Sequence, residues 1–334
     1  MRGSVGAGRC ADGWETTMKV VEVAGRADLA QVHVLELRRG DRWRVECVGA
    51  VDPSVPRCDK VVLVVSSQFG CPIGCVMCDA GAWYEGNLTA DEIRAQIRHL
   101  VETWAGAEAR TCPKFKVQFA RMGEPALNDA VLEVIDTLGE IVPTAGLVAC
   151  VATTAPRSRA AWFERLTEIR RRKYGPEQFQ LQFSVQSTDE QVRDRMIPIP
   201  KWSLREIGDF AKWFVRPGDR KVTLNIALTR DVPVSADVLA SMVAPESCVI
   251  KLTPLNPTAS TGAHGLRTAF DQAGDSAVGK LVTEIEGHGL RCIVSVGDAE
   301  ESAMGTSCGQ LARLARSRPS HTHTPPSGPD PGLP

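Results

Sequence analysis

Apolar and polar residues alternate with two different periods along the chain, and the change of period divides it into two parts. Between residues 30 and 50, apolar positions alternate with polar ones on both sides of Arg39-Gly40-Asp41, which predicts a β-hairpin that turns there. From Lys60 onward, short apolar runs alternate with segments whose apolar residues recur at helical spacing. This pattern predicts alternating strands and helices, and therefore a parallel sheet with right-handed crossovers.

Seven apolar runs predict the strands of this sheet. They cover residues 60–66, 114–120, 146–152, 179–185, 221–228, 248–253 and 291–296. Two of the intervening helices are expected to begin at capping boxes, one formed by Thr89 and Glu92 and the other by Ser203 and Glu206. A β/α barrel, open or closed, and a doubly wound sheet both fit the alternation. Both folds place a site at the carboxyl ends of the strands.

The two ends of the chain are less regular. Residues 1 to about 25 lack a clear period, and residues 316–334 are rich in Pro, Ser and Thr, which predicts a disordered tail. We expect an N-terminal extension with the hairpin at 1–55, a β/α domain at 56–315 and the tail. No apolar run approaches the roughly 20 residues that cross a bilayer, and no signal peptide is evident, which favours a cytoplasmic protein without a membrane partner.

Composition changes this picture in two respects. The 334 residues include 11 cysteines, and in a chain with no sign of export these indicate metal ligation or thiol chemistry rather than disulfides. Lys and Arg number 39 against 40 Asp and Glu, which argues against a surface built mainly to neutralise phosphates. Histidines number only six, so a metal site built from histidine is not expected.

Three cysteines directly after the first strand of the alternating region carry the strongest chemical signal. Cys71, Cys75 and Cys78 lie on a predicted loop, which can fold back so that the three thiolates converge on one inorganic centre. Three protein ligands leave one metal position open for a small molecule, whereas structural zinc prefers a fourth protein ligand. A four-iron cluster is therefore expected, with zinc or three incidental cysteines as alternatives.

The C-x3-C-x2-C spacing at this place in a β/α chain is typical of radical S-adenosylmethionine (SAM) enzymes, and further segments resemble the RlmN/Cfr family. These segments are NLTADEI at 87–93, MGEP at 122–125, SVQSTDEQVRD at 184–194, IPIPKW at 197–202, KLTPLNP at 251–257 and CGQL at 308–311. They follow the family order and span roughly residues 30–315. The resemblance implies an α/β fold of the partial (β/α)6-type barrel class, a [4Fe-4S] cluster, SAM, and an external flavodoxin- or ferredoxin-like electron donor.

The resemblance also implies which residues hold these groups. The cluster ligands would be Cys71, Cys75 and Cys78, and the SAM contacts Gly123, Glu124, Ser184, Val185, Gln186 and Asn256. For Ser184 and Asn256, ordinary capping at a strand end is the alternative. Two positions depart from the pattern, because Met77 replaces an aromatic residue and Ala152 replaces a serine contact.

Two residues are implied to act in the reaction, which in this family methylates C2 or C8 of an RNA adenosine. Cys308 matches a methyl-carrying cysteine: one SAM methylates its thiolate, a second yields the radical that abstracts hydrogen from the methyl group, and the methylene adds to the substrate carbon. A buried structural cysteine is the alternative. Glu46 resembles a proton acceptor, with a solvated hairpin glutamate as the alternative.

Two departures from the family concern the substrate and its release. Val64 stands where the family has a second reactive cysteine, and neither Cys47 nor Cys58 has the same register. Only 45 residues precede Glu46, which is short for the helical domain that helps RNA-acting members hold RNA. Together with the balanced charge, this favours a small nucleoside-like or biosynthetic substrate over RNA. A radical SAM enzyme without methyl transfer and a non-catalytic metal protein are further alternatives.

Overall fold

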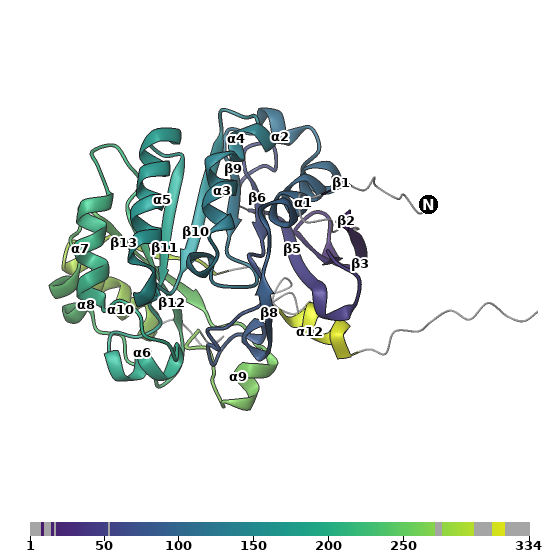
Figure 1. Cartoon of the computed structure of the whole chain (residues 1–334). Coiled ribbons are helices and arrows are strands. Elements are labelled where there is room, and N and C mark those ends of the chain that lie inside the picture. The colour runs from purple at the N-terminus through teal and green to yellow at the C-terminus, as the bar shows by residue number, and fades with distance from the viewer. Residues whose placement is uncertain are drawn as a thin grey trace, which may run out of the picture.

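A single ten-stranded sheet forms the frame of the molecule (Figure 1). The computed structural model describes residues 8–9, 15–16, 18–52, 54–270, 276–296 and 309–317. The strand order is β14-β13-β12-β11-β10-β9-β6-β5-β4-β3. Every pair from β14 to β6 is parallel, and every pair from β6 to β3 is antiparallel.

The parallel part of the sheet confirms the predicted fold class. Its strands are β6 (Val61–Val65), β9 (Phe115–Phe119), β10 (Leu147–Thr153), β11 (Phe179–Ser184), β12 (Val222–Leu228), β13 (Cys248–Pro254) and β14 (Cys292–Val294). They lie side by side in chain order, without the reversal that defines a doubly wound sheet. Because β14 and β3 are unpaired edges among the described residues, the barrel is partial.

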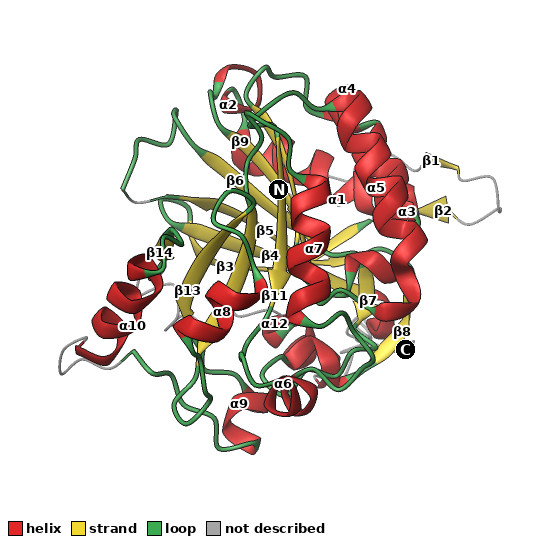
Figure 2. Ribbon diagram, turned by 90° about the vertical axis from the view of Figure 1, so that its left-hand side faces the viewer, coloured by secondary structure: helices red, strands yellow, loops and turns green. Residues whose placement is uncertain are grey.

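The described helices lie on both sides of this sheet: most cover its outer side (Figures 1 and 2), and the C-terminal one packs on its inner side. They are α1 (Ala90–Leu100), α2 (Glu108–Thr111), α3 (Ala130–Asp136), α4 (Leu138–Ile141), α5 (Ala160–Lys173), α6 (Glu190–Met196), α7 (Leu204–Phe214), α8 (Ala236–Met242), α9 (Ala259–Ala263), α10 (Ser276–Gly287) and α12 (Gln310–Ser317). Both predicted capping boxes are present, at Thr89 and at Ser203. The main core fills the space between these helices and alternate residues of the strands.

The predicted hairpin is confirmed and belongs to the same sheet. It consists of β4 (Ala30–Glu36) and β5 (Arg44–Val51), and β5 pairs with β6. A further strand, β3 (Lys19–Arg26), was not predicted, because it lies at the sheet edge and its Val20 and Val23 side chains are exposed. The short strands β1 (Gly8–Arg9) and β2 (Glu15–Thr16) pair with each other.

The predicted domain limits fall in identifiable places. The limit at residue 55 lies in the loop between β5 and β6, and the three-part division stays a prediction. Helix α12 ends at Ser317, two residues inside the predicted tail, and residues 318–334 lie outside the described part of the chain. Within the described part, none of the helices has the length and apolar character to span a membrane.

Candidate active site

The three predicted ligand cysteines lie on a loop closed by two short strands. Strands β7 (Gln68–Gly70) and β8 (Tyr84–Asn87) pair antiparallel and flank the loop. The amide of Cys71 donates a hydrogen bond of 2.9 Å to the carbonyl of Trp83, and the amide of Cys78 donates one of 3.0 Å to the carbonyl of Cys75. The backbone therefore folds back on itself and places the three cysteines at the carboxyl end of β6.

The three thiols of the loop lie near one another. Burial raises the pKa of Cys71 and of Cys75, and the negative charge of neighbouring thiols, including Cys78, raises both further, so the three side chains lie near one another. Among the described residues, no three His, Cys, Asp or Glu side chains are placed to hold one metal ion. Cysteine thiolates are the donors that hold iron–sulfur clusters in proteins.

An apolar cap covers the cysteine loop from the side of α6. Ile73 of the loop is buried against Met196 and Ile197, and the partly buried Cys71, Cys75 and Met77 pack against this group. The amide of Val76 also donates a hydrogen bond of 3.2 Å to the carbonyl of Met196. The position of the loop therefore depends on the segment that follows α6.

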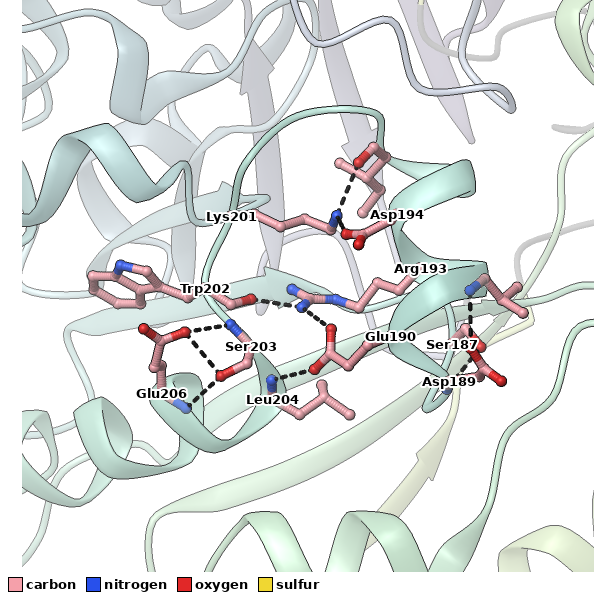
Figure 3. A network of polar contacts seen from close by, with 12 residues as sticks. Ser187, Asp189, Glu190, Arg193, Asp194, Lys201, Trp202, Ser203, Leu204 and Glu206 are labelled. Atoms are coloured by element: carbon pink, nitrogen blue, oxygen red, sulfur yellow. Dashed lines mark hydrogen bonds and ion pairs between the residues drawn. The ribbon is translucent and has the colours of Figure 1, made fainter.

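A network of polar contacts holds that segment in place (Figure 3). The buried Arg193 guanidinium donates hydrogen bonds to the carbonyl of Trp202 at 2.6 Å and to the carboxylate of Glu190 at 3.1 Å. The buried Lys201 ammonium donates to Asp194 at 2.5 Å and to the carbonyl of Ile197 at 2.9 Å. These side chains tie the end of α6 to the turn that leads into α7.

Replacing Arg193 by Met is expected to destabilise the protein by about 1–3 kcal/mol, because the carbonyl of Trp202 loses its donor. Urea unfolding followed by circular dichroism measures the change. Arg195→Met is the matched control, since Arg195 lies on the same helix with its side chain exposed. Equal stability of the two variants would contradict a supporting role for Arg193.

Gly123 and Glu124 lie beside the cysteines, as the sequence predicted. The backbone amide of Gly123 faces the sulfur of Cys71. Gly123 has a φ of 100°, and an added Cβ would come within 2.7 Å of side-chain atoms of Gln68 and Ser67, so only glycine fits. This close approach brings the end of β9 against the cysteine loop.

The carboxylate of Glu124 is buried, and each of its oxygens accepts two hydrogen bonds. It accepts hydrogen bonds from the Thr153 hydroxyl at 2.5 Å, from the Thr154 amide and hydroxyl at 2.7 and 2.8 Å, and from the Ala126 amide at 3.0 Å. Burial raises the pKa of Glu124, and these hydrogen bonds oppose that effect. The carboxylate is thus held rigidly beside the cysteines, where its negative charge can attract a ligand ammonium group.

The other predicted SAM contacts lie at the carboxyl ends of β11 and β13. Ser184 is half-buried. The Val185 side chain lies in the main core, so only the backbone of this residue could contact SAM. Gln186 has a φ of 68° and accepts a hydrogen bond of 3.0 Å from the amide of Ala227. Asn256 is exposed. The structure thus places all four at the same edge of the sheet as Glu124.

Glu46 is buried, unlike the solvated glutamate that was the alternative. One carboxylate oxygen accepts from the Arg121 guanidinium at 2.8 and 2.7 Å and from the amide of Gly309 at 2.9 Å. The other oxygen accepts from the amide of Ala312 at 2.8 Å. Glu46 therefore caps the beginning of α12 from a distant strand. Its carboxylate accepts hydrogen bonds from two amides that have no partner within the helix itself.

Cys308 lies outside the described residues, and its neighbour Gly309 begins the described C-terminal segment. From there α12 packs across β4 and β5, with Leu311 and Ala315 against a small apolar cluster. The side chain of Val64 packs against the same cluster. The position of the missing second cysteine therefore faces the helix that follows Cys308.

The two other cysteines considered as replacements lie elsewhere. Cys47 is buried in the main core, on the opposite face of β5 from Glu46, and burial raises the pKa of its thiol. Cys58 is exposed in the loop before β6, at the opposite edge of the sheet from the cysteine loop. Neither thiol shares the face and edge of the sheet where Val64 meets α12.

Two further residues belong to this site and were not predicted from the sequence, because neither is part of a recognised motif. Arg121 directly precedes the MGEP segment and pairs with Glu46. Asp79 directly follows Cys78, is buried, accepts from the amides of Ala259 and Ser260, and pairs with Arg313 of α12 at 3.1 Å. Only their position next to a recognised motif could have indicated from the sequence that they lie in the site.

The chain is similar to known proteins in sequence and in fold. No family model matches the chain. A probable dual-specificity RNA methyltransferase RlmN of Thermobifida fusca is 30% identical over 266 residues, which is 76% of this chain and 68% of that protein. Its counterpart from Corynebacterium efficiens is 28% identical over 76% of this chain and 67% of that protein. The crystal structure of a radical SAM methyltransferase from Sphaerobacter thermophilus superposes with a TM-score of 0.66 at 21% identity, covering 88% of this chain and 81% of that one, which shows the fold.

Proposed function

Because the chain belongs to the RlmN family of radical SAM methyltransferases, we propose that it transfers a methyl-derived carbon from SAM, through Cys308, to an unactivated carbon of a small substrate. The observation that carries this proposal is the convergence of the cysteine loop, Glu124 and the Glu46-capped start of α12 at one edge of the sheet. A [4Fe-4S] cluster and SAM would supply the electron, the methyl group and the radical chemistry.

The chain's own residues would hold and orient these groups. Cys71, Cys75 and Cys78 would ligate the cluster, and the apolar cap over their loop would exclude water from it. The rigid Glu124 carboxylate would orient the ammonium group of SAM. Gly123, Ser184, the backbone of Val185, Gln186 and Asn256 would line the remainder of the SAM site. An external flavodoxin- or ferredoxin-like protein would deliver electrons.

Glu46 would act on the reaction through Cys308. Its two oxygens are occupied by Arg121 and by the amides of Gly309 and Ala312, so it is built to fix the start of α12, next to Cys308 in sequence. The family resemblance assigns it proton acceptance from the substrate. Its contacts in this chain support a positioning role as well.

The charges at this edge of the sheet support a small substrate rather than RNA. Four arginines at this edge of the sheet are each paired with a carboxylate: Arg38 with Glu92, Arg44 with Glu36 and Asp41, Arg121 after β9 with Glu46, and Arg313 of α12 with Asp79. Paired guanidinium groups have less capacity to neutralise phosphates. RNA, the substrate in the names of the curated relatives, remains the second candidate.

Methylation of Cys308 tests the proposal directly. The anaerobically reconstituted enzyme, incubated with SAM and a reductant, is expected to gain one methyl group on the peptide that contains Cys308, and Cys308→Ala is expected to gain none. Peptide mass spectrometry measures this. An unmodified Cys308 with intact SAM cleavage would refute methyl transfer. RNA binding whose log affinity falls with log salt by roughly 0.7 per contacted phosphate would favour the RNA candidate.

A further inference from the structure

The inner face of the parallel sheet, which we call the lumen, is polar. Alternate residues of each strand lie in the main core under the helices, so the remaining residues face inward. From β6 to β13 these inward residues are Val62, Val64, Lys116, Gln118, Val148, Cys150, Ala152, Gln180, Gln182, Ser184, Thr223, Asn225, Ala227, Val249, Lys251 and Thr253. Small closed barrels fill this space with apolar side chains, whereas this lumen presents amides, hydroxyls and ammonium groups.

The lumen residues carry two positive charges and no negative one. Lys116 and Lys251 are both half-buried, and none of the inward residues is Asp or Glu. The Lys116 ammonium donates a hydrogen bond of 2.8 Å to the side-chain oxygen of Gln180. The Lys251 ammonium has neither a hydrogen-bond nor an ion-pair partner among the described residues. Burial lowers the pKa of both lysines, and the positive charge of Lys60 lowers both further.

Lys251 lies in a row of polar residues that leads to the candidate SAM site. Ser184 pairs with Asn225, and Asn225 pairs with Lys251, so the three occupy one level on adjacent strands about 4.8 Å apart. The amide of Asn225 also has no side-chain partner among the described residues. An ammonium, an amide and a hydroxyl at one level are the donors that a carboxylate or phosphate group requires.

We propose that the lumen binds an anionic group of the substrate, a carboxylate or a phosphate, through Lys251 and Asn225, with Lys116 deeper in the same lumen. This inference rests on the proposed function, since it places the reacting end of that substrate toward the cysteine loop and Cys308. It defines the substrate class as a small anion. Among the inward-facing residues named above, Lys116 and Lys251 are the positive charges, and neither is paired with a carboxylate.

Anion binding to the reconstituted full chain tests this site without any need for turnover. Inorganic phosphate and acetate, titrated at constant ionic strength, are expected to raise the Tm of the wild-type protein. Lys251→Met is expected to weaken phosphate binding by at least about tenfold. Lys251→Arg keeps the charge and is expected to retain binding. Lys280→Met removes an exposed lysine of α10 and is the matched control, with binding unchanged.

Three outcomes overturn the proposal. The first is a wild-type Tm that responds to neither anion. The second is an equal rise in Tm with phosphate in Lys251→Met and in the wild type. If Lys251→Met does not fold, Asn225→Ala is measured in its place and is expected to show the same weakening of phosphate binding. The third is a Lys251 variant with weakened SAM binding and normal phosphate binding, which would assign the ammonium to SAM itself. Because Cys308 methylation is measured separately, failure here leaves the methyltransferase proposal standing.

Discussion

Replacement of any one of Cys71, Cys75 and Cys78 by Ala is expected to abolish iron binding and SAM cleavage together. The three thiols lie on one closed loop beneath an apolar cap, and no other cysteine of the described residues lies on this loop to replace a lost ligand. Loss of residues that only support metal ligands costs about 10–100-fold in metal affinity or activity, so loss of a ligand is expected to exceed that range. Iron content after reconstitution, about four per chain in the wild type, measures the effect.

The control for this prediction is Cys58→Ala. Cys58 is exposed in the loop before β6, at the opposite edge of the sheet, and its removal is expected to leave iron content unchanged. Retention of iron in the three ligand variants, or binding of one zinc per chain in their place, would contradict the cluster assignment.

Substitution of Glu46 by Gln is expected to loosen the start of α12 and to lower Cys308 methylation about 10–100-fold, by analogy with the loss of residues that orient metal ligands. A Gln side chain would set its NH2 group against the amide of Gly309 or Ala312 and would leave Arg121 without its counter-charge. Breaking a buried ion pair in this way costs about 3–5 kcal/mol. Hydrogen exchange of the peptide covering 309–317 is expected to become faster.

Arg121→Met separates the two functions considered for Glu46. If Glu46 positions α12, this variant is expected to show the same faster exchange and the same loss of Cys308 methylation. If Glu46 serves only as a proton acceptor, Glu46→Gln would retain a methylated Cys308 and slow exchange of α12, and only product release would stop. Glu140→Gln, which changes an exposed glutamate of α4, is the control for both measurements.

Local patterns predicted most of the fold. Each parallel strand has an apolar run, because one face of every strand lies in the core, and the helices after Thr89 and Ser203 begin with complete capping boxes. Strand β3 was missed for the opposite reason. It lies at an edge with Val20 and Val23 exposed, so its residues follow no burial alternation.

The site was predictable only where its residues are close in sequence. The cysteine loop and the Gly123-Glu124 pair are short motifs, and the structure brings them together. The contacts of Glu46 join residues 75 and 263 positions apart, and no local pattern marks them. Lys251 opens the KLTPLNP segment, but no local pattern marks its side chain as inward-facing. A lysine at an alternating position of a strand is normally a solvent-facing residue, and here the curve of the partial barrel turns it inward.

The contacts of α12 also determine when the site can be completed. Glu46 binds the amide of Gly309, Asp79 binds Arg313, and the Arg44 guanidinium donates to the carbonyl of Ala315, across separations of 263, 234 and 271 residues. All three of these partners precede α12 in the chain, so the residues that hold the helix are synthesised before the helix itself. The contact of α12 with Asp79, next to Cys78, can therefore form only after nearly all of the described chain has been made.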